Sequence, residues 1–318
     1  MNAATGSSGA HGFERVAVLG AGAMGSLFAA RIAEAGAQVV VIDVDPARLA
    51  AIGGQGITLT DDGGTRTVPV TASLAAGVRP PIDLIILFTK GMHSASAIAS
   101  VEHLRDGWPV VLTLQNGIGN AELLADAFGA DRVVMGTALI PADLAGPAAV
   151  TTHGAASLCV GPMAAGARDP TERVAALLAQ AGSSVSCPDD IAAAVWEKVA
   201  FNAALNAIAM LCEVPNSGLD NPPGRRISEA VAREAAAVAA AKGIVIDPAG
   251  IMASIDTALR EHHGHKASML QDREAGRPTE IETINGAISR EGARLGVSTP
   301  VCDTLSDLVR IVEARPTS

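Results

Sequence analysis

The sequence predicts a two-domain α/β protein, with a doubly wound parallel sheet first and an all-helical domain second. Short β-branched segments alternate with helical segments from Arg15 to about Asp190. These β-segments are apolar at nearly every position, which is typical of parallel strands covered by helices on both faces. Beyond residue 190 the β-segments stop and only helical patterns remain.

Five segments are predicted to form the sheet: RVAVLG, QVVVID, DLIILFTK, PVVLTLQN and VVMGTAL. Predicted helices separate most of them, at residues 24–35, 93–104 and 121–128. Two further segments break this alternation, and each is predicted to form a β-hairpin: GITLTDDGGTRTVPV, with its turn at residues 61–64, and AVTTHGAASLCVGP.

The second half is predicted to form helices at residues 191–212, 225–242, 248–262, 266–275, 280–295 and 301–314. Gly243, Gly276 and Gly296 are typical residues to end three of them. The chain is therefore expected to divide into a disordered, Gly/Ser-rich tail at residues 1–13, a sheet domain at 14–189 and a helical domain at 190–318.

The composition excludes several classes of partner. The 318 residues carry a formal charge of −10, which argues against nucleic acid and anionic membranes. Aromatic residues make up 2% and there is no Tyr, so platforms for stacking bases are not expected. No run of about 18 apolar residues is available to span a membrane. The all-helical second domain offers a plausible face for a homodimer.

The four cysteines, Cys159, Cys187, Cys212 and Cys302, are far apart and form no C-x-x-C pair. This spacing fits neither a zinc site nor a disulfide framework. The N-terminus also lacks the apolar stretch of a signal peptide. We therefore expect a cytoplasmic protein whose thiols are reduced and which holds no metal.

The segment VAVLGAGAMGSLFAARIAEAG carries a G-x-G-x-x-G motif between the first predicted strand and the first helix. Gly20 permits a tight turn, Gly22 lets the backbone approach a pyrophosphate, and Gly25 lets the helix pack on the strand. A simple tight turn is the alternative, but the second strand follows at the spacing of a Rossmann-type dinucleotide-binding domain. The predicted cofactor site contains Gly20, Ala21, Gly22, Ala23, Met24 and Gly25.

The second predicted strand ends at Asp43. A carboxylate at this position normally accepts hydrogen bonds from the adenosine ribose and repels a 2′-phosphate, which favours NAD over NADP. Arg48 lies close by and could instead serve a phosphate, whereas Asp45 is interpreted as a turn residue facing solvent.

Three polar residues interrupt the apolar helix VWEKVAFNAALNAIAML at intervals of four: Lys198, Asn202 and Asn206. Side chains four apart lie on one face of a helix. An amine among apolar side chains has a lowered pKa and can act as a general acid when a ketone is reduced, while the amides hold substrate oxygens. The alternative is a surface Lys with two amides that pack between helices.

Four further polar residues are candidates for the same site. Lys90 and Asn116 follow the third and fourth apolar strands, and the carboxyl ends of parallel strands face the ligand crevice. Ser268 and Glu280 lie in the polar segment HKASMLQDREAGRPTEIETINGAI. Alternatively, Lys90 is a surface charge, Asn116 belongs to a turn, Ser268 caps a helix, and Glu280 begins one where the dipole favours an acid.

Taken in order, the glycine motif, TK after a strand, QNG after the next, WEKVAFNAALNAI, and SMLQD with TEIETINGAI resemble the ketopantoate reductase (2-dehydropantoate 2-reductase) family over about residues 15–315. The resemblance implies reduction of 2-dehydropantoate to pantoate with NADPH, in the pathway to pantothenate. It also implies that Lys198 is the catalytic general acid and that Glu280 is the second catalytic carboxylate.

The resemblance assigns the remaining candidates as well. Positions that hold the substrate correspond to Asn202, Asn206, Ser268 and Asn116. Lys90 and Asn116 resemble positions that contact the cofactor near the nicotinamide. One departure is IDVDPAR after the second strand, where family members often place an Arg that grips the 2′-phosphate. NADH use therefore stays open, as does a relative on the same fold that oxidises another 2-hydroxy acid, of the D-mandelate kind.

Several other families and mechanisms fit the sequence less well. β-Hydroxyacid dehydrogenases share the glycine motif, but their Lys follows a glycine-rich run that DDIAAAVWEKVAFN lacks. Short-chain dehydrogenases need a catalytic Tyr, and the chain has none. A His-based mechanism of the lactate dehydrogenase type is the other alternative. However, His153 lies in a predicted hairpin, and His262, His263 and His265 are interpreted as solvated surface residues. A dinucleotide sensor without catalysis would need no proton donor, so the intact pair of Lys198 and Glu280 argues against it.

Overall fold

The structure, a computed structural model, describes residues 12–261 and 264–314. By its internal contacts the chain divides into two compact units, one containing residues 12–115 and 120–191 and the other containing residues 116–119 and the described residues from 192 onward. Most of the tail predicted at residues 1–13 lies outside the described residues, as do His262 and His263. Phe13 is described and buried, and its ring lies 4.3 Å from the Arg173 guanidinium.

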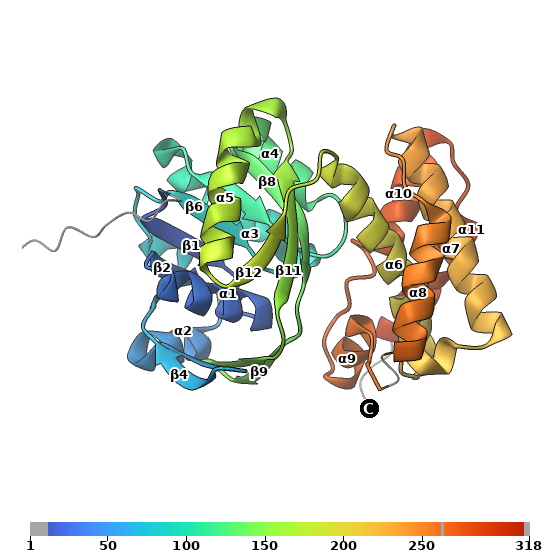
Figure 1. The fold of residues 1–318 in the computed structure, drawn as a ribbon, viewed down its shortest axis with the longest axis horizontal. Helices are drawn as coiled ribbons and strands as arrows, with labels where there is room; N and C mark the ends of the chain where they lie inside the picture. The colour runs from blue at the N-terminus through green and yellow to red at the C-terminus, as the bar shows by residue number, and fades with distance from the viewer. Residues whose placement is uncertain (1–11, 262–263, 315–318) are drawn as a thin grey trace, which may run out of the picture. The chain divides into compact units, whose positions relative to one another are not determined.

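The first unit is built on an eight-stranded sheet with the order β12-β11-β8-β7-β6-β1-β2-β5 (Figure 1). Its strands are β1 (Arg15–Leu19), β2 (Gln38–Ile42), β5 (Thr71–Ser73), β6 (Leu84–Leu87), β7 (Val110–Thr113), β8 (Val133–Leu139), β11 (Ala156–Pro162) and β12 (Ser183–Ser186). Neighbouring strands from β5 to β8 are parallel, and β11 is antiparallel to β8. The predicted α/β fold is confirmed. Its strand order reverses at β1, where such sheets bind ligands.

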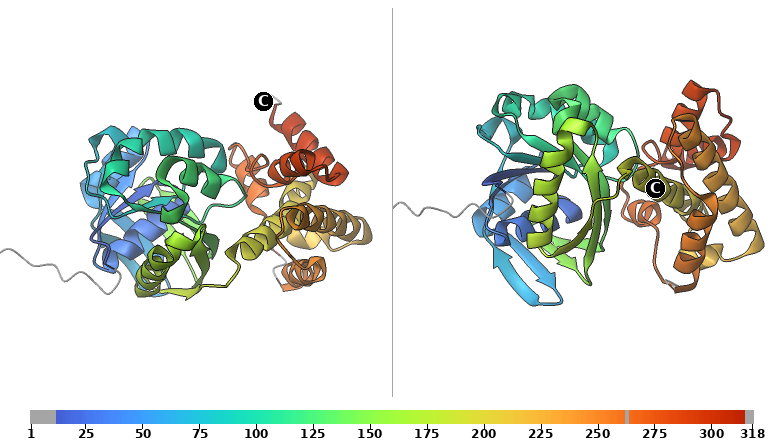
Figure 2. Two further views of the ribbon diagram at one scale, coloured as in Figure 1. Left: turned by 90° about the horizontal axis from the view of Figure 1, so that it is seen from above. Right: turned by 45° about the horizontal axis from the view of Figure 1, so that its top comes forward.

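Helices cover both faces of this sheet: α1 (Ala23–Glu34), α2 (Pro46–Gln55), α3 (Ser94–Ser100), α4 (Asn120–Phe128) and α5 (Arg168–Gln180). Figure 2 shows the teal helices α3 and α4 on the face opposite the yellow-green helix α5. Alternate residues of each strand face opposite sides, so β1 contributes Val16 and Val18 to one core and Ala17 and Leu19 to the other.

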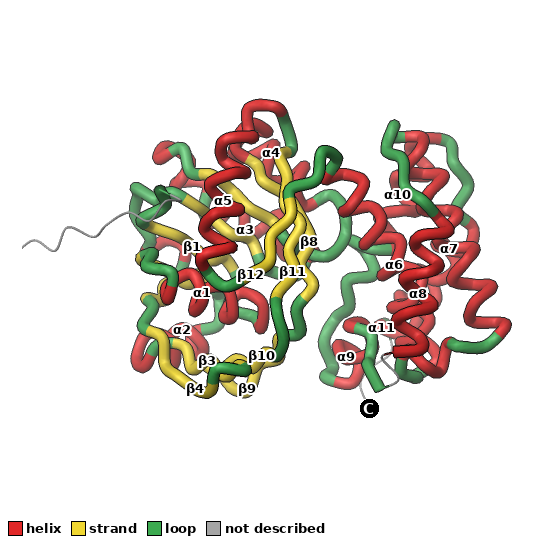
Figure 3. Tube along the Cα trace, in the orientation of Figure 1, coloured by secondary structure: helices red, strands yellow, loops and turns green. Residues whose placement is uncertain are grey.

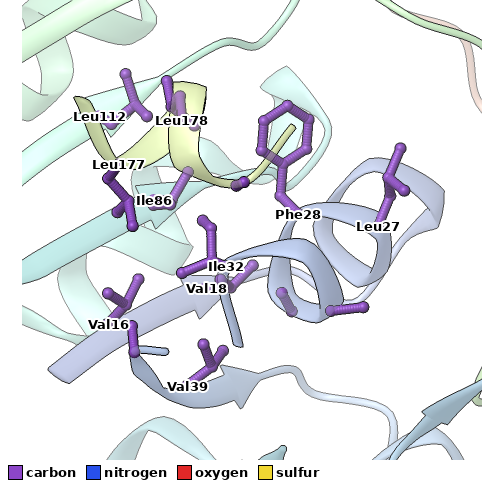
Figure 4. Packing of buried hydrophobic residues seen from close by; sticks show 14 of the residues in the cluster. Val16, Val18, Leu27, Phe28, Ile32, Val39, Ile86, Leu112, Leu177 and Leu178 are labelled. Atoms are coloured by element: carbon purple, nitrogen blue, oxygen red, sulfur yellow. The ribbon is translucent and has the colours of Figure 1, made fainter. Parts of the chain in front are cut away.

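The first of these cores lies under α1 and α5 (Figure 4). Val16 and Val18 meet Ile32 of α1, and Leu177 and Leu178 of α5 close the same cluster. Burial of an aliphatic side chain of this size contributes roughly 1.5–3 kcal/mol. The β-branched strands are therefore fixed by packing on both faces, and their carboxyl ends present the loops at one edge.

A second sheet of four strands has the order β4-β3-β10-β9 (Figure 3). Its strands are β3 (Ile57–Asp61), β4 (Gly64–Val68), β9 (Ala142–Gly146) and β10 (Ala149–Thr152). The hairpin predicted at GITLTDDGGTRTVPV is confirmed, because Asp61 pairs with Gly64 next to the turn. The hairpin predicted at AVTTHGAASLCVGP is wrong. Its two segments are β10 and β11, which belong to different sheets, and Gly154 with φ +70° lies between them.

The second unit is helical apart from its loops (Figure 3). It contains α6 (Ile191–Cys212) from residue 192 onward, α7 (Pro222–Ala241), α8 (Pro248–Glu261), α9 (Ser268–Glu274), α10 (Asn285–Leu295) and α11 (Pro300–Glu313). The second unit also contains the short 3₁₀ helix η6 (Asn216–Leu219). The other short 3₁₀ helices belong to the first unit: η1 (Ala75–Gly77), η2 (Gly91–His93), η3 (Glu102–Gly107), η4 (Ala130–Arg132) and η5 (Ala165–Ala167). Among the described residues, no helix has the length and apolar character needed to cross a membrane.

Two predicted helices differ from the observed ones. The helix predicted at residues 93–104 is α3 followed by the 3₁₀ segment η3. The helix predicted from Glu280 begins only at Asn285, so Glu280 is not at a helix start. The intervening residues form a turn in which the amides of Thr283 and Ile284 both donate to the Glu280 carbonyl oxygen, at 3.1 Å each.

Candidate active site

The glycine loop joins β1 to α1 at the switch point of the sheet. Gly20 has φ +104°, and a Cβ on it would lie 2.8 Å from the Thr89 amide nitrogen. A Cβ on Gly25 would lie 1.8 Å from the Gly20 carbonyl oxygen, so only glycine lets α1 start this close to the loop. By contrast, a Cβ on Gly22 would meet no atom within 4 Å. The loop thus leaves room for a pyrophosphate beside Gly22 and the N-terminus of α1.

The Asp43 carboxylate follows β2 and contacts this loop. Its Oδ2 accepts a hydrogen bond from the Ala21 amide at 2.6 Å, and its Oδ1 accepts from the amides of Val44 and Asp45 at 2.8 and 2.9 Å. Ala21 is buried, and Ala23 and Met24 form the first residues of α1. The acid at the end of β2 therefore lies beside the glycine loop, where an adenosine ribose binds in such folds.

Arg48 holds the other side of the same peptide segment. Its Nη1 donates to the Ala21 carbonyl oxygen at 2.6 Å. Asp45 caps α2, since its Oδ1 accepts from the amides of Ala47 and Arg48 at 2.9 and 3.2 Å. Asp45 is thus a helix cap, and the glycine loop is fixed at Ala21 by an acid on one side and a guanidinium on the other.

Lys90 follows β6 and is half-buried. The residue before it, Thr89, is held by Gln115, whose Nε2 donates to the Thr89 carbonyl oxygen at 2.5 Å and to Ser94 Oγ at 3.0 Å. Thr113 Oγ1 in turn donates to Gln115 Oε1 at 3.0 Å. Gln115 was not among the predicted site residues, although its place at the end of β7, beside the end of β6, is a signal for it.

Asn116 and Glu280 meet in the second unit. Asn116 Nδ2 donates to Glu280 Oε2 at 3.4 Å. Both side chains are half-buried, and they come from segments more than 160 residues apart in the chain. The amide and the carboxylate were predicted separately, and the structure brings them together.

Lys198 lies on α6 among buried apolar residues that include Trp196 and Val199. Burial lowers the pKa of its amine to about 8, and the negative charge of Glu280 opposes this shift. An ordinary lysine amine is charged until pH exceeds about 10. Lys198 can therefore exchange its proton close to neutral pH, as a general acid requires.

The two amides of the stripe differ in exposure. Asn202 is half-buried, whereas Asn206 is buried and its Nδ2 donates to Ser268 Oγ at 3.1 Å. Ser268 is the first residue of α9, and the N-cap of that helix is Ala267, which makes no side-chain cap. The Ser268 hydroxyl is therefore tied to α6 by Asn206, and the alternative that it caps the helix is wrong.

The predicted site residues fall into two groups. In the first unit, the glycine loop, Asp43 and Lys90 lie at the carboxyl ends of β1, β2 and β6. The second unit contains Asn116, Lys198, Asn202, Asn206, Ser268 and Glu280. Among the described residues, no cluster of three or more His, Cys, Asp or Glu side chains is placed to hold a metal ion.

Family models match most of the chain. The model described as ketopantoate reductase PanE/ApbA matches residues 16–165, and the model for the C-terminal part of the same family matches residues 190–313. The 2-dehydropantoate 2-reductase of Halobacterium salinarum is 32% identical over 302 residues, which cover 94% of this chain and 99% of that protein. The Lactococcus lactis enzyme of the same name is 29% identical over 305 residues, with 94% and 98% covered.

Solved structures agree with this family. A D-mandelate dehydrogenase in complex with NADH and anilino(oxo)acetate has a TM-score of 0.89 and 30% identity, covering 94% of this chain and 98% of that one. A PanE/ApbA family ketopantoate reductase from Ralstonia eutropha has a TM-score of 0.85 and 29% identity at the same coverage. Two family models cover both units, and full-length relatives reach 32% identity. The chain therefore belongs to the ketopantoate reductase family of NAD(P)-dependent oxidoreductases.

Proposed function

We propose that this protein reduces the ketone of a 2-keto acid to a 2-hydroxy acid, with 2-dehydropantoate as the leading substrate. The observation that carries the proposal is the Lys198 amine, whose pKa is lowered to about 8 by burial on the helix that also holds Asn202 and Asn206. The two relatives named above, both called 2-dehydropantoate 2-reductase, support the choice of substrate.

The first unit fits a nicotinamide dinucleotide, which supplies the hydride when bound. Gly22 leaves space beside the N-terminus of α1 for the pyrophosphate, and Gly20 and Gly25 close the turn around it. Lys90 follows β6, the strand beside β1 across the switch point, where we expect it to contact the cofactor.

The second unit supplies the proton donor and the residues that bind the substrate. As the carbonyl carbon gains a hydride, its oxygen becomes an alkoxide, and Lys198 Nζ donates the proton that neutralises it. Glu280 supports the charged form of Lys198, since its negative charge opposes the effect of burial on the lysine pKa. Asn202, Asn206, Ser268 and Asn116 are the groups we assign to the hydroxyl and carboxylate oxygens of the substrate.

A second candidate is an NAD-dependent dehydrogenase of another 2-hydroxy acid. The observation that favours it is the likeness to D-mandelate dehydrogenase, which was solved with NADH and anilino(oxo)acetate. Asp43 beside the glycine loop agrees with NADH use, because a carboxylate repels a 2′-phosphate. Both candidates use the same proton donor and differ in the substituent that the substrate pocket accepts.

The test of the proposal is a steady-state panel of 2-keto acids, including 2-dehydropantoate and phenylglyoxylate, each with NADH and with NADPH. The highest kcat/KM with 2-dehydropantoate supports the first candidate, and the highest value with phenylglyoxylate supports the second. Binding of the dinucleotide without turnover of any 2-keto acid contradicts both and leaves a cofactor-binding sensor.

Asp43 provides a prediction on cofactor choice. Replacing it with Ala removes the carboxylate beside the ribose site, so the ratio of kcat/KM with NADPH to that with NADH should rise about tenfold, equivalent to about 1.4 kcal/mol. The variant also loses the bond to the Ala21 amide, which weakens both cofactors alike and cancels in the ratio. Asp62→Ala is the matched control, because it removes a similar bond from a carboxylate to a backbone amide, that of Gly154, outside the glycine loop. An unchanged ratio in Asp43→Ala contradicts this role.

A further inference from the structure

The loop of residues 116–119 follows β7 and precedes α4, yet its contacts place it in the second unit. The amide of Ile118 donates to the Thr283 carbonyl oxygen at 3.0 Å. The chain thus leaves the first unit at Gln115, docks on the turn before α10 and returns at Asn120. The position of Asn116 therefore depends on contacts in the second unit as well as on the strand before the loop.

Gly117 is the residue that permits this docking. Its φ is +92°, which side chains other than glycine rarely adopt. A Cβ on Gly117 would lie 2.3 Å from the Thr283 carbonyl oxygen and 2.8 Å from the Thr283 carbonyl carbon. Since these are backbone atoms, no rotation of a side chain would make room. The hydrogen bond of Ile118 and the missing Cβ of Gly117 therefore depend on the same close approach.

The docked turn also carries Glu280. Thr283 donates its amide to the Glu280 carbonyl oxygen at 3.1 Å and its Oγ1 to the same oxygen at 3.2 Å. Asn116 Nδ2 reaches the Glu280 carboxylate at 3.4 Å. Contacts on Thr283 consequently set the place of Asn116 against Glu280, and the charge of Glu280 acts on Lys198.

We propose that Gly117 is a positioning residue, which docks its loop on Thr283 and so holds Asn116 against the Glu280 carboxylate. The kinetic part of this inference rests on the proposed function, whereas the docking itself does not. The loop is built into the second unit, and Asn116 keeps its place relative to Lys198 and Glu280 through that docking.

The chain offers a matched pair of substitutions for the test. Gly119 has φ +98°, close to that of Gly117, but a Cβ on it would meet no atom within 4 Å. Gly119→Ala thus measures the cost of the backbone conformation alone, and Gly117→Ala measures that cost together with the clash against Thr283. Thermal unfolding of both variants shows how far each is destabilised.

Steady-state kinetics with the best 2-keto acid separate positioning from mere stability. Gly117→Ala should lower kcat/KM about 10- to 100-fold. The loop must move to relieve the contact between the new Cβ and the Thr283 carbonyl oxygen, and this movement misplaces Asn116. The KM for the dinucleotide should change less, and Gly119→Ala should stay within about threefold of wild type. The loss should match that of Asn116→Ala, and the double variant Asn116→Ala with Gly117→Ala should lose little more than either single one. Additive losses would contradict the proposal.

Hydrogen exchange tests the docking without any substrate. The Ile118 amide should exchange slowly with solvent in wild type and in Gly119→Ala. In Gly117→Ala its exchange rate should be at least about tenfold higher. In wild type at increasing denaturant concentration, the Ile118 amide should become exposed to exchange together with the amides of α10 rather than with those of β7. This measurement needs no variant to fold. Opening with β7, or full protection and full activity in Gly117→Ala, overturns the inference. If wild type turns over no 2-keto acid, the proposed function fails and exchange alone decides the docking.

Discussion

Arg66 of the first unit and Lys198 of the second are both cations that interact with carboxylates, yet their protons are held very differently. Arg66 donates to Glu34 Oε1 through Nε at 2.5 Å and to Asp61 Oδ1 through Nη1 at 2.8 Å. These hydrogen bonds raise its pKa well above the usual range of arginine. Its side chain remains 37% exposed to solvent.

Lys198 shows the opposite balance. Lys198 is half-buried on an apolar helix, and loss of solvation lowers the pKa of its amine to about 8. Glu280 acts on it in the same direction as Glu34 acts on Arg66, but this effect is the smaller one. In Lys198 the loss of solvation outweighs the nearby carboxylate, whereas in Arg66 direct hydrogen bonds to carboxylates outweigh burial. Where burial dominates, the proton becomes available for chemistry.

The largest effect on activity should come from removing the amine that donates the proton. Lys198→Ala should lower kcat for ketone reduction about 1,000-fold, because a general acid contributes roughly 10²- to 10⁴-fold. Dinucleotide binding, measured by fluorescence titration, should stay near wild type, since the glycine loop belongs to the other unit. Arg66→Ala is the control from the opposite side of the comparison, and its kcat should not change. A Lys198→Ala variant with wild-type kcat would remove the proposed role.

The pH profile should report the same proton. Reduction needs the charged amine, so kcat/KM, which reports the pKa values of the free enzyme, should be level below the pKa of about 8 and fall about tenfold per pH unit above it. In Lys198→Ala this descending limb should disappear. A limb that persists in the variant would belong to another group.

Stability should respond in the direction opposite to activity. Below pH 8, Lys198 is charged in the folded and the unfolded chain, and the folded chain bears the cost of burying that charge. Lys198→Met should therefore raise the free energy of unfolding of the second unit by up to about 3 kcal/mol at pH 7, because burial holds the lysine pKa at about 8 instead of its usual 10.5. Urea unfolding followed by Trp196 fluorescence in a Trp108→Phe background reports on this unit alone.

The advantage of Lys198→Met should depend on pH with a defined sign. Between pH 8 and 10.5 the folded wild type has released the proton that the unfolded chain still binds, so wild-type stability rises with pH. The gain from the substitution should therefore shrink across this window and vanish above it. A variant less stable than wild type at pH 7 would show that contacts of the amine outweigh its loss of solvation.

Local patterns predicted those parts of the fold that local physics determines. The bounds of α6 agree with the predicted 191–212, because 22 residues without Gly or Pro are apolar enough to form one buried helix. The glycine loop was also predicted correctly in outline, since Gly20 and Gly25 leave no room for a Cβ. The stripe of Lys198, Asn202 and Asn206 follows from helical periodicity alone.

Long-range pairing was beyond such patterns. The segments β10 and β11 are close in sequence and strand-like, but they do not pair with each other. β10 pairs with β9 and with the distant β3, whereas β11 pairs with β8 and β12 in the other sheet. The start of α10 was misplaced because the turn at Glu280 is held by contacts with the loop of residues 116–119 as well as by its own sequence. The place of Gln115 at a strand end was a signal in the sequence, but its bond to the Thr89 carbonyl oxygen, 26 residues away, was not.

The smallest expected effect completes the comparison. Arg66→Gln breaks ion pairs in which Arg66 and Glu34 are both about one-third exposed, so the first unit should lose only about 1 kcal/mol, a typical value for surface pairs. Trp108 fluorescence in a Trp196→Phe background follows that unit, and added salt should weaken the difference. Lys266→Gln, which breaks an exposed pair with Glu274 on the second unit, should change stability by no more. Opposite signs for Arg66→Gln and Lys198→Met would establish that solvation, rather than the presence of a carboxylate, separates a structural cation from a proton donor here. Destabilisation by both would refute it.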